Sequence, residues 1–140
     1  MKRLGWFTSS ETKTPTEPIV WLGEDGILRV DYGDSPHIDG AMIEKIRQKH
    51  IALSDKPLPV MFMATGRPSS TKDGREAAST PEICNITTAV AFVTKSWYIR
   101  QLLDLYLTFD RPPYPAFVCE TEEDAADWLI RYVRQSEGES

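Results

Sequence analysis

Short apolar runs and alternating patterns recur along the chain at the spacing of β-strands. Three runs are almost wholly apolar, as in strands that are covered on both faces. Two earlier segments are joined by Gly-Glu-Asp-Gly, a typical hairpin connection, and the second alternates Leu28, Val30 and Tyr32 with polar residues. The predicted strands are residues 19–22, 27–32, 60–64, 88–93 and 116–119.

Apolar residues at helical spacing lie between these strands and after the last one. Asp39, Ser96 and Thr121 are placed to cap the helices that follow them. Residues 72–79 form a weaker helix because of Gly74, and Pro81 suits the first position of another. The helix after Ser96 is apolar on more than one face, which predicts deep packing or an interface.

The resulting order, ββαβαβαβα, predicts an α/β fold with a single-layer mixed sheet of about five strands, mainly parallel after the hairpin. A chain of 140 residues fits one domain. We divide it into an N-terminal extension (1–18), the α/β domain (19–134) and a polar tail (135–140). Residues 4–7 could pair as an edge strand, and Trp128, on the apolar stripe of the last helix, is predicted to be a core anchor.

The composition of the chain indicates which kinds of partner and which compartment to expect. The formal net charge of −5 argues against nucleic acid as a partner, because phosphate binding needs concentrated Lys and Arg. No apolar run approaches membrane-spanning length and no signal peptide is visible, so we expect a cytoplasmic protein without membrane insertion. Cys84 and Cys119 are far apart and lie in apolar surroundings, so we expect buried free thiols.

No catalytic constellation is visible. The two histidines, His37 and His50, lie in a predicted turn and on a helix stripe, and neither Gly-x-Ser-x-Gly nor a phosphate-binding glycine motif occurs. We expect His50 to be a packed core or boundary histidine rather than a ligand. Zinc needs about four clustered Cys or His ligands, and these are scattered. We therefore predict no catalytic residue, no metal and no cofactor, and expect that the chain is not an enzyme.

The loop after the third strand, residues 65–75, is the most suggestive polar segment. Strand ends and helix starts of this kind collect ligands and bind anions in open α/β sheets. A mobile polar connector is the alternative interpretation. The candidate regulatory hydroxyls are Thr65, Ser69, Ser70 and Thr71, and the candidate anion-binding cations are Arg67, Lys72 and Arg75.

These features together resemble the small STAS-like (SpoIIAA-like) bacterial proteins. The resemblance covers roughly residues 19–134, and its most specific part is the closing Arg-Pro-Pro-Tyr-Pro segment, strand and Thr-Glu-Glu-Asp-Ala-Ala-Asp-Trp-Leu helix. It implies a non-enzymatic regulatory or protein-interaction domain. Antagonists of anti-sigma factors in the wider family are phosphorylated on a hydroxyl after a central strand, in an Asp-Ser-Gly-like turn. Thr65 is the nearest match, but Ala64-Thr65-Gly66 lacks the Asp.

Two further expectations concern ligands and partners. The alternative function is a small-molecule or lipid carrier with an apolar cleft lined by Trp97, Tyr98 and Tyr106. Aromatic residues near exposed places, Trp6 and Phe7 in addition to Trp97 and Tyr98, predict self-association as a homodimer. A protein regulator is a further possible partner.

Overall fold

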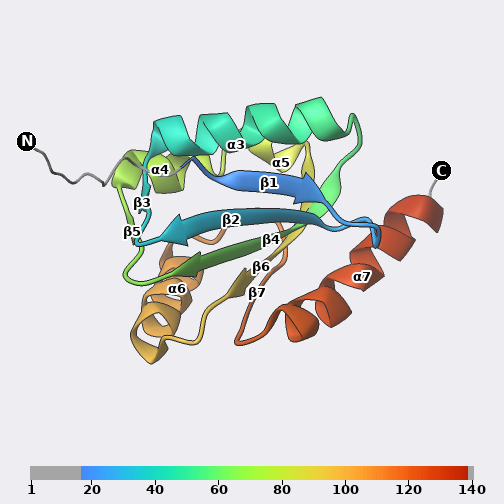
Figure 1. Ribbon diagram of the computed structural model, residues 1–140. Coiled ribbons are helices and arrows are strands. Elements are labelled where there is room, and N and C mark those ends of the chain that lie inside the picture. The colour runs from blue at the N-terminus through green and yellow to red at the C-terminus, as the bar shows by residue number, and fades with distance from the viewer. Residues whose placement is uncertain (1–16, 139–140) are drawn as a thin grey trace, which may run out of the picture.

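The computed structural model describes residues 17–138 (Figure 1). The predicted edge strand at residues 4–7, with Trp6 and Phe7, lies outside the described residues. Glu17 begins the described chain and is fixed beside the first long helix, because its carboxylate pairs with Lys45 Nζ at 2.7 Å and Lys49 Nζ at 3.5 Å.

The main sheet has five strands in the order β1-β2-β4-β6-β7. β1 pairs antiparallel with β2, and all later pairs are parallel, so the predicted mixed α/β sheet is confirmed. A second, two-stranded sheet of β3 and β5 was not predicted, because two-residue strands carry no periodicity. The strands are β1 Ile19–Leu22, β2 Leu28–Asp34, β3 His37–Ile38, β4 Leu58–Thr65, β5 Ser69–Ser70, β6 Thr87–Val93 and β7 Ala116–Cys119.

Three of the described helices begin at the predicted caps. Asp39 Oδ1 accepts from the Met42 amide at 2.9 Å, Ser96 Oγ from the Ile99 amide at 3.2 Å, and Thr121 Oγ1 from the Asp124 amide at 3.0 Å. The helices are α3 Gly40–Leu53, α4 Lys72–Ala77, α5 Pro81–Cys84, α6 Trp97–Phe109 and α7 Glu122–Gly138. The last helix thus continues into residues 135–138, where the sequence had suggested a polar tail.

The hairpin between β1 and β2 depends on a glycine. Gly26 has φ +87°, a conformation that L side chains rarely adopt, and a Cβ there would lie 2.9 Å from Val133 Cγ1 on α7. Close approach to the last helix and the left-handed backbone both therefore require a residue without a side chain at this turn.

The strand order explains how the helices are distributed. From β2 the chain moves one strand outward at each crossover, and parallel crossovers are almost always right-handed. The connecting helices α3 to α6 consequently share one face, and within residues 17–138 α7 is the one helix that covers the other (Figure 1).

The α7 face is closely packed. Met61, Ala89 and Ala91 of the central strands are fully buried against Ala125 and Leu129 of α7. Trp128 lies at the margin of this cluster, half-buried, and its ring stacks on Phe117 at a centroid distance of 5.1 Å. Tyr132 packs on its other side at 5.0 Å. Trp128 is therefore a packing residue of this face.

The opposite face is covered only in part. Leu28, Val30, Val60 and Val90 are buried beneath α3. Further along the strands Phe62 is only half-buried, although the sequence predicted that residues 60–64 would be covered on both faces. The prediction fails at the carboxyl half of β4 because α6 does not close over it.

Candidate ligand-binding site

A cavity of about 590 Å³ opens on this partly covered face. Its floor consists of β2, β4 and β6, and its walls come from α3, α4, α5 and α6. Most lining side chains are apolar or aromatic. Small-molecule sites in proteins typically measure roughly 300–1,000 Å³ and have apolar walls with a few polar groups, so this cavity is the candidate site.

Three stacked aromatic rings form the centre of the floor. Tyr32, Phe62 and Phe92 come from neighbouring parallel strands; the first two rings lie 5.5 Å apart at 14°, and the second two 5.6 Å apart at 20°. Rings stacked in this way turn their faces toward one another, so their edges line the cavity. The edge of an aromatic ring carries partial positive charge and attracts π faces and oxygen acceptors.

Helix α6 borders the cavity without closing it. Its inner side chains Ile99, Leu103 and Tyr106 line the cavity, and none of its residues is fully buried. Trp97, which the sequence placed in an apolar cleft, instead lies outside the cavity and is 74% exposed. Tyr98 and Tyr106, its two predicted companions, do line the cavity. Deep packing of α6 is therefore excluded.

The Pro-Pro-Tyr-Pro segment supplies one wall. Tyr114 lines the cavity, and its hydroxyl donates to the Ala78 carbonyl at 3.1 Å, which ties the segment to the end of α4. Burial, with Tyr106 and Tyr32 close by, raises the pKa of the Tyr114 phenol far above its usual range. The motif that carries the family resemblance thus serves as a structural part of the cavity.

The predicted hydroxyl loop lies at the cavity rim, where Ser69 and Ser70 are lining residues. As β5, these two serines pair with β3, and Ser69 Oγ lies 2.9 Å from His37 Nδ1. Thr65 is exposed, and its Oγ1 lies 3.4 Å from the Gly33 carbonyl oxygen. Thr71 caps α4: its Oγ1 accepts from the Gly74 amide at 3.0 Å and donates to Asp73. Only Ser69 and Ser70 belong to the cavity.

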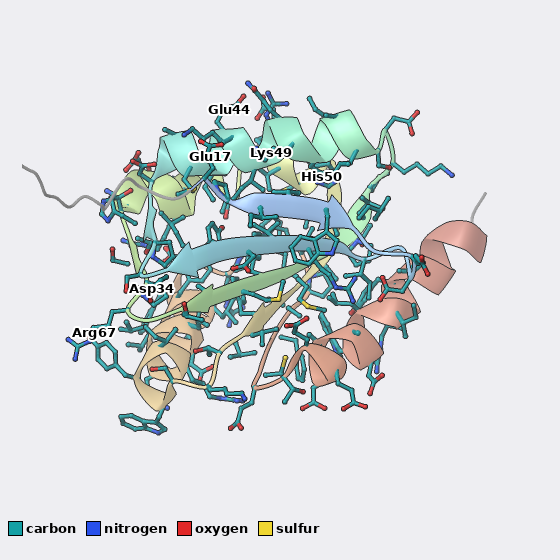
Figure 2. The ribbon with its side chains drawn as sticks, in the orientation of Figure 1. Glu17, Asp34, Glu44, Lys49, His50 and Arg67 are labelled. Atoms are coloured by element: carbon teal, nitrogen blue, oxygen red, sulfur yellow. The ribbon has the colours of Figure 1, made fainter. Side chains whose placement is uncertain are left out.

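The three predicted anion-binding cations do not converge. Arg67 is exposed and points away from the sheet at the carboxyl end of β4 (Figure 2). Lys72 lies 3.9 Å from Glu76 on the exposed side of α4. Arg75 is at the rim, where it donates to Ser70 Oγ at 3.1 Å and lies 3.9 Å from Asp110 Oδ2. Their positions do not form one phosphate site.

His50 lines the opposite end of the cavity, on α3 (Figure 2). It is 2% exposed, its Nε2 has no partner among the described residues, and burial lowers its pKa. It is the packed histidine that the sequence predicted, and it is neutral at physiological pH.

Apart from His50, the reactive side chains to consider in the described part of the chain are the two cysteine thiols. Cys119 is buried and Cys84 half-buried; burial raises the pKa of both thiols, and both are free. No group of three or more His, Cys, Asp or Glu side chains between residues 17 and 138 is placed to hold a metal ion. In the same part of the chain, no helix is long and apolar enough to cross a membrane.

Sequence reasoning missed the residues that make the floor. Phe62 and Phe92 stood inside apolar runs and were assigned to a covered core, and Tyr32 was taken as one buried position of an alternating strand. The available signal was an aromatic residue near the carboxyl end of each of three strands that are neighbours in the sheet. Only the strand order reveals that these three residues are adjacent.

Fold and cavity define the class: an α/β domain with one mixed sheet, packed by α7 on one face and hollowed beneath α6 on the other. Residues 20–133 match a protein family described as a domain of unknown function, DUF7793. The match spans most of the chain, so the protein belongs to this family. Neither the curated proteins nor the solved structures include a significant match.

Proposed function

We propose that the chain is a cytoplasmic, non-enzymatic STAS-like regulatory domain that acts by binding a small apolar molecule. The observation that carries this proposal is the 590 Å³ cavity with its aromatic floor. The element order supports the STAS-like part, since this order was one of the features on which the resemblance rested. No catalytic set of side chains converges on the cavity within residues 17–138, which favours binding over chemistry.

The incomplete cover of the central strands is the physical reason to expect a ligand. Phe62 and Phe92 belong to strands that lie inside the sheet, yet both remain half-buried. Each Å² of apolar surface left in water forgoes about 25 cal/mol of stabilisation. A bound apolar molecule would recover that stabilisation without any rearrangement of the strands.

Two measurements test the cavity. The first is native mass spectrometry of the purified protein, with solvent extraction and identification of any retained molecule. The second is titration with diphenylhexatriene, a fluorescent hydrocarbon, against wild type and Ala64→Phe, since Ala64 lines the cavity and a larger side chain would fill part of it. Ala52→Phe, at an exposed position of α3 outside the cavity, is the matched control.

We expect one saturable site in the wild type, weakened at least fivefold by Ala64→Phe and unchanged by Ala52→Phe, because filling the cavity removes apolar contact area worth about 1 kcal/mol or more. Absence of saturable binding in the wild type, together with no retained molecule, would refute the proposed ligand. Equal effects of the two substitutions would place the probe outside the cavity.

A second candidate function, protein contact through α6, is favoured by the exposed apolar residues of that helix. Tyr98, Leu102, Leu105 and Phe109 follow one another at spacings of four, three and four residues, the pattern of a helix-pairing seam, and are 43–78% exposed. Tyr98 and Leu102 also line the cavity, so this seam runs along the cavity edge. With Trp97 they expose roughly 600 Å² of side chain, approaching the roughly 800 Å² per partner of a standard interface. We propose a second copy of this chain as the occupant, giving a homodimer.

Light scattering at tens of micromolar tests the homodimer with two matched charge substitutions. Leu105→Glu places a carboxylate in the seam, whereas Ile51→Glu does the same at an exposed apolar position of α3. We expect a dimer in wild type and Ile51→Glu, and a monomer in Leu105→Glu, because a charge buried at an interface is strongly unfavourable. A monomeric wild type would refute self-association through α6 and leave another protein regulator as the occupant to seek.

The hydroxyl loop is proposed as the regulatory element of the cavity. Ser70 lies at the rim, and its side chain already contacts Arg75. A phosphate on Ser70 would add nearly two negative charges beside this guanidinium, which would draw Arg75 from Asp110 and alter the cavity entrance.

A further inference from the structure

The aromatic part of the cavity floor includes one hydroxyl group. Of the three stacked rings, only Tyr32 carries a hydroxyl, and this residue is 6% exposed. The hydroxyl makes no hydrogen bond to any residue within the described part of the chain. It differs in this respect from Tyr114, whose hydroxyl donates to the Ala78 carbonyl. A ligand atom placed opposite this hydroxyl could accept a hydrogen bond from it, worth about 1 kcal/mol.

The phenols of the cavity are donors rather than charged groups. Burial, with Tyr106 nearby, raises the pKa of Tyr32 far above its usual range, and burial also raises the pKa of Tyr106. Tyr32 therefore keeps its proton at physiological pH. The edges of Phe62 and Phe92 beside it carry partial positive charge and also favour an electron-rich neighbour.

The charged residues that line the cavity are already paired. Arg47 binds Glu44 at 2.7 Å through its Nη2, and Arg75 contacts Ser70 and Asp110. His50 is neutral because of its burial. The interior thus offers the Tyr32 hydroxyl, and the neutral His50 imidazole at its opposite end, but no free cation. This suits a neutral oxygen acceptor beside Tyr32 and disfavours a carboxylate, whose burial without a counter-charge is costly.

We propose that the cavity binds a neutral aromatic molecule that carries a carbonyl oxygen, and that the Tyr32 hydroxyl donates a hydrogen bond to this oxygen. The aromatic body of the ligand lies over the ring edges of the floor, in the edge-to-face arrangement that aromatic pairs prefer. This inference rests on the proposed function of the cavity as a ligand site and adds the chemical class of the ligand.

The test uses three probes of similar size. They are the fluorescent naphthyl ketone 6-propionyl-2-dimethylaminonaphthalene, the hydrocarbon diphenylhexatriene, and 6-dimethylamino-2-naphthoate (called naphthoate below), which is a carboxylate at neutral pH. Wild type is compared with Tyr32→Phe, which keeps the ring and its stacking on Phe62 but removes the hydroxyl. Tyr132→Phe makes the same change on α7, outside the cavity, and serves as the matched control.

We expect Tyr32→Phe to weaken ketone binding about fivefold, the worth of one hydrogen bond, and to shift the emission of the bound ketone to shorter wavelength. Hydrocarbon affinity should change less than twofold, and naphthoate should bind the wild type at least tenfold more weakly than the ketone. Tyr132→Phe should leave all three unchanged.

Three outcomes overturn the inference, and they differ from failure of the proposed function. Equal weakening of ketone and hydrocarbon would show that Tyr32→Phe damages the site rather than removing a hydrogen bond. Unchanged ketone affinity would remove Tyr32 as the donor, and naphthoate binding as tightly as the ketone would overturn the neutral ligand class. If neither the ketone nor the hydrocarbon binds the wild type, the cavity itself is refuted as a ligand site.

Discussion

Truncation of Trp128 gives the sharpest test of how the α7 face is held together. The ring stacks on Phe117 at 5.1 Å and packs against Tyr132 at 5.0 Å, so Trp128→Ala removes two aromatic contacts. Because Trp128 is half-buried, less than the full area of a tryptophan is lost from the core. An aromatic side chain buries about 150–250 Å² when covered, so half to two-thirds of that at about 25 cal/mol per Å² gives roughly 2–4 kcal/mol.

That range lies at or below the cost of removing a fully buried tryptophan, about 3–5 kcal/mol. It is a large share of a stability that is typically about 5–15 kcal/mol. The assay is equilibrium urea unfolding followed by far-ultraviolet circular dichroism, with the free energy of unfolding taken at constant slope. Trp97→Ala is the matched control, because Trp97 is 74% exposed on α6.

We expect Trp97→Ala to change the free energy of unfolding by less than about 0.5 kcal/mol, as surface substitutions usually do, when measured at a concentration where the protein is monomeric. If Trp128→Ala also stays within about 0.5 kcal/mol, the packing account of the last helix is refuted. If Trp97→Ala is the more costly of the two, the outer face of α6 contributes more to stability than its exposure indicates.

Three further predictions concern His50 and the loop at the cavity rim. Burial lowers the pKa of His50 below the ordinary 6.5, so the unfolded chain binds a proton more readily than the folded chain. The free energy of unfolding should therefore have its full value above about pH 6.5 and decline as the pH falls toward the pKa of the folded state, by up to about 1.4 kcal/mol per pH unit. Urea unfolding at pH 7.5, 6.0 and 5.0 should show a weaker decline in His50→Leu than in the wild type, and identical slopes would contradict a buried neutral His50. Thr71→Ala should lower the free energy of unfolding by about 1 kcal/mol through loss of the α4 cap, with Thr71→Ser as the cap-retaining control in thermal melts. Ser70→Asp should shift the melting temperature by less than about 2 °C, since the serine is exposed, yet change ligand dissociation relative to Ser70→Ala; unchanged dissociation would leave the loop as a connector.

The order of elements was readable from the sequence because it depends on local signals. Apolar runs mark the strands, and caps such as Asp39, Ser96 and Thr121 act within one turn of their helices, so the residues responsible are close together in the chain. Trp128 was predicted to be a core anchor because the apolar stripe that contains it lies within one helix; in the structure it packs against the core from its margin and is half-buried.

The site depends on contacts that the sequence does not specify locally. Tyr32, Phe62 and Phe92 are each thirty residues apart and become neighbours only when β4 lies between β2 and β6. Whether α6 closes over them depends on the lengths and angles of its connections, which a helical stripe cannot reveal. The sequence therefore determined which residues form strands and helices, whereas the tertiary structure decided which apolar residues are core and which line a cavity, because burial depends on what packs against a face.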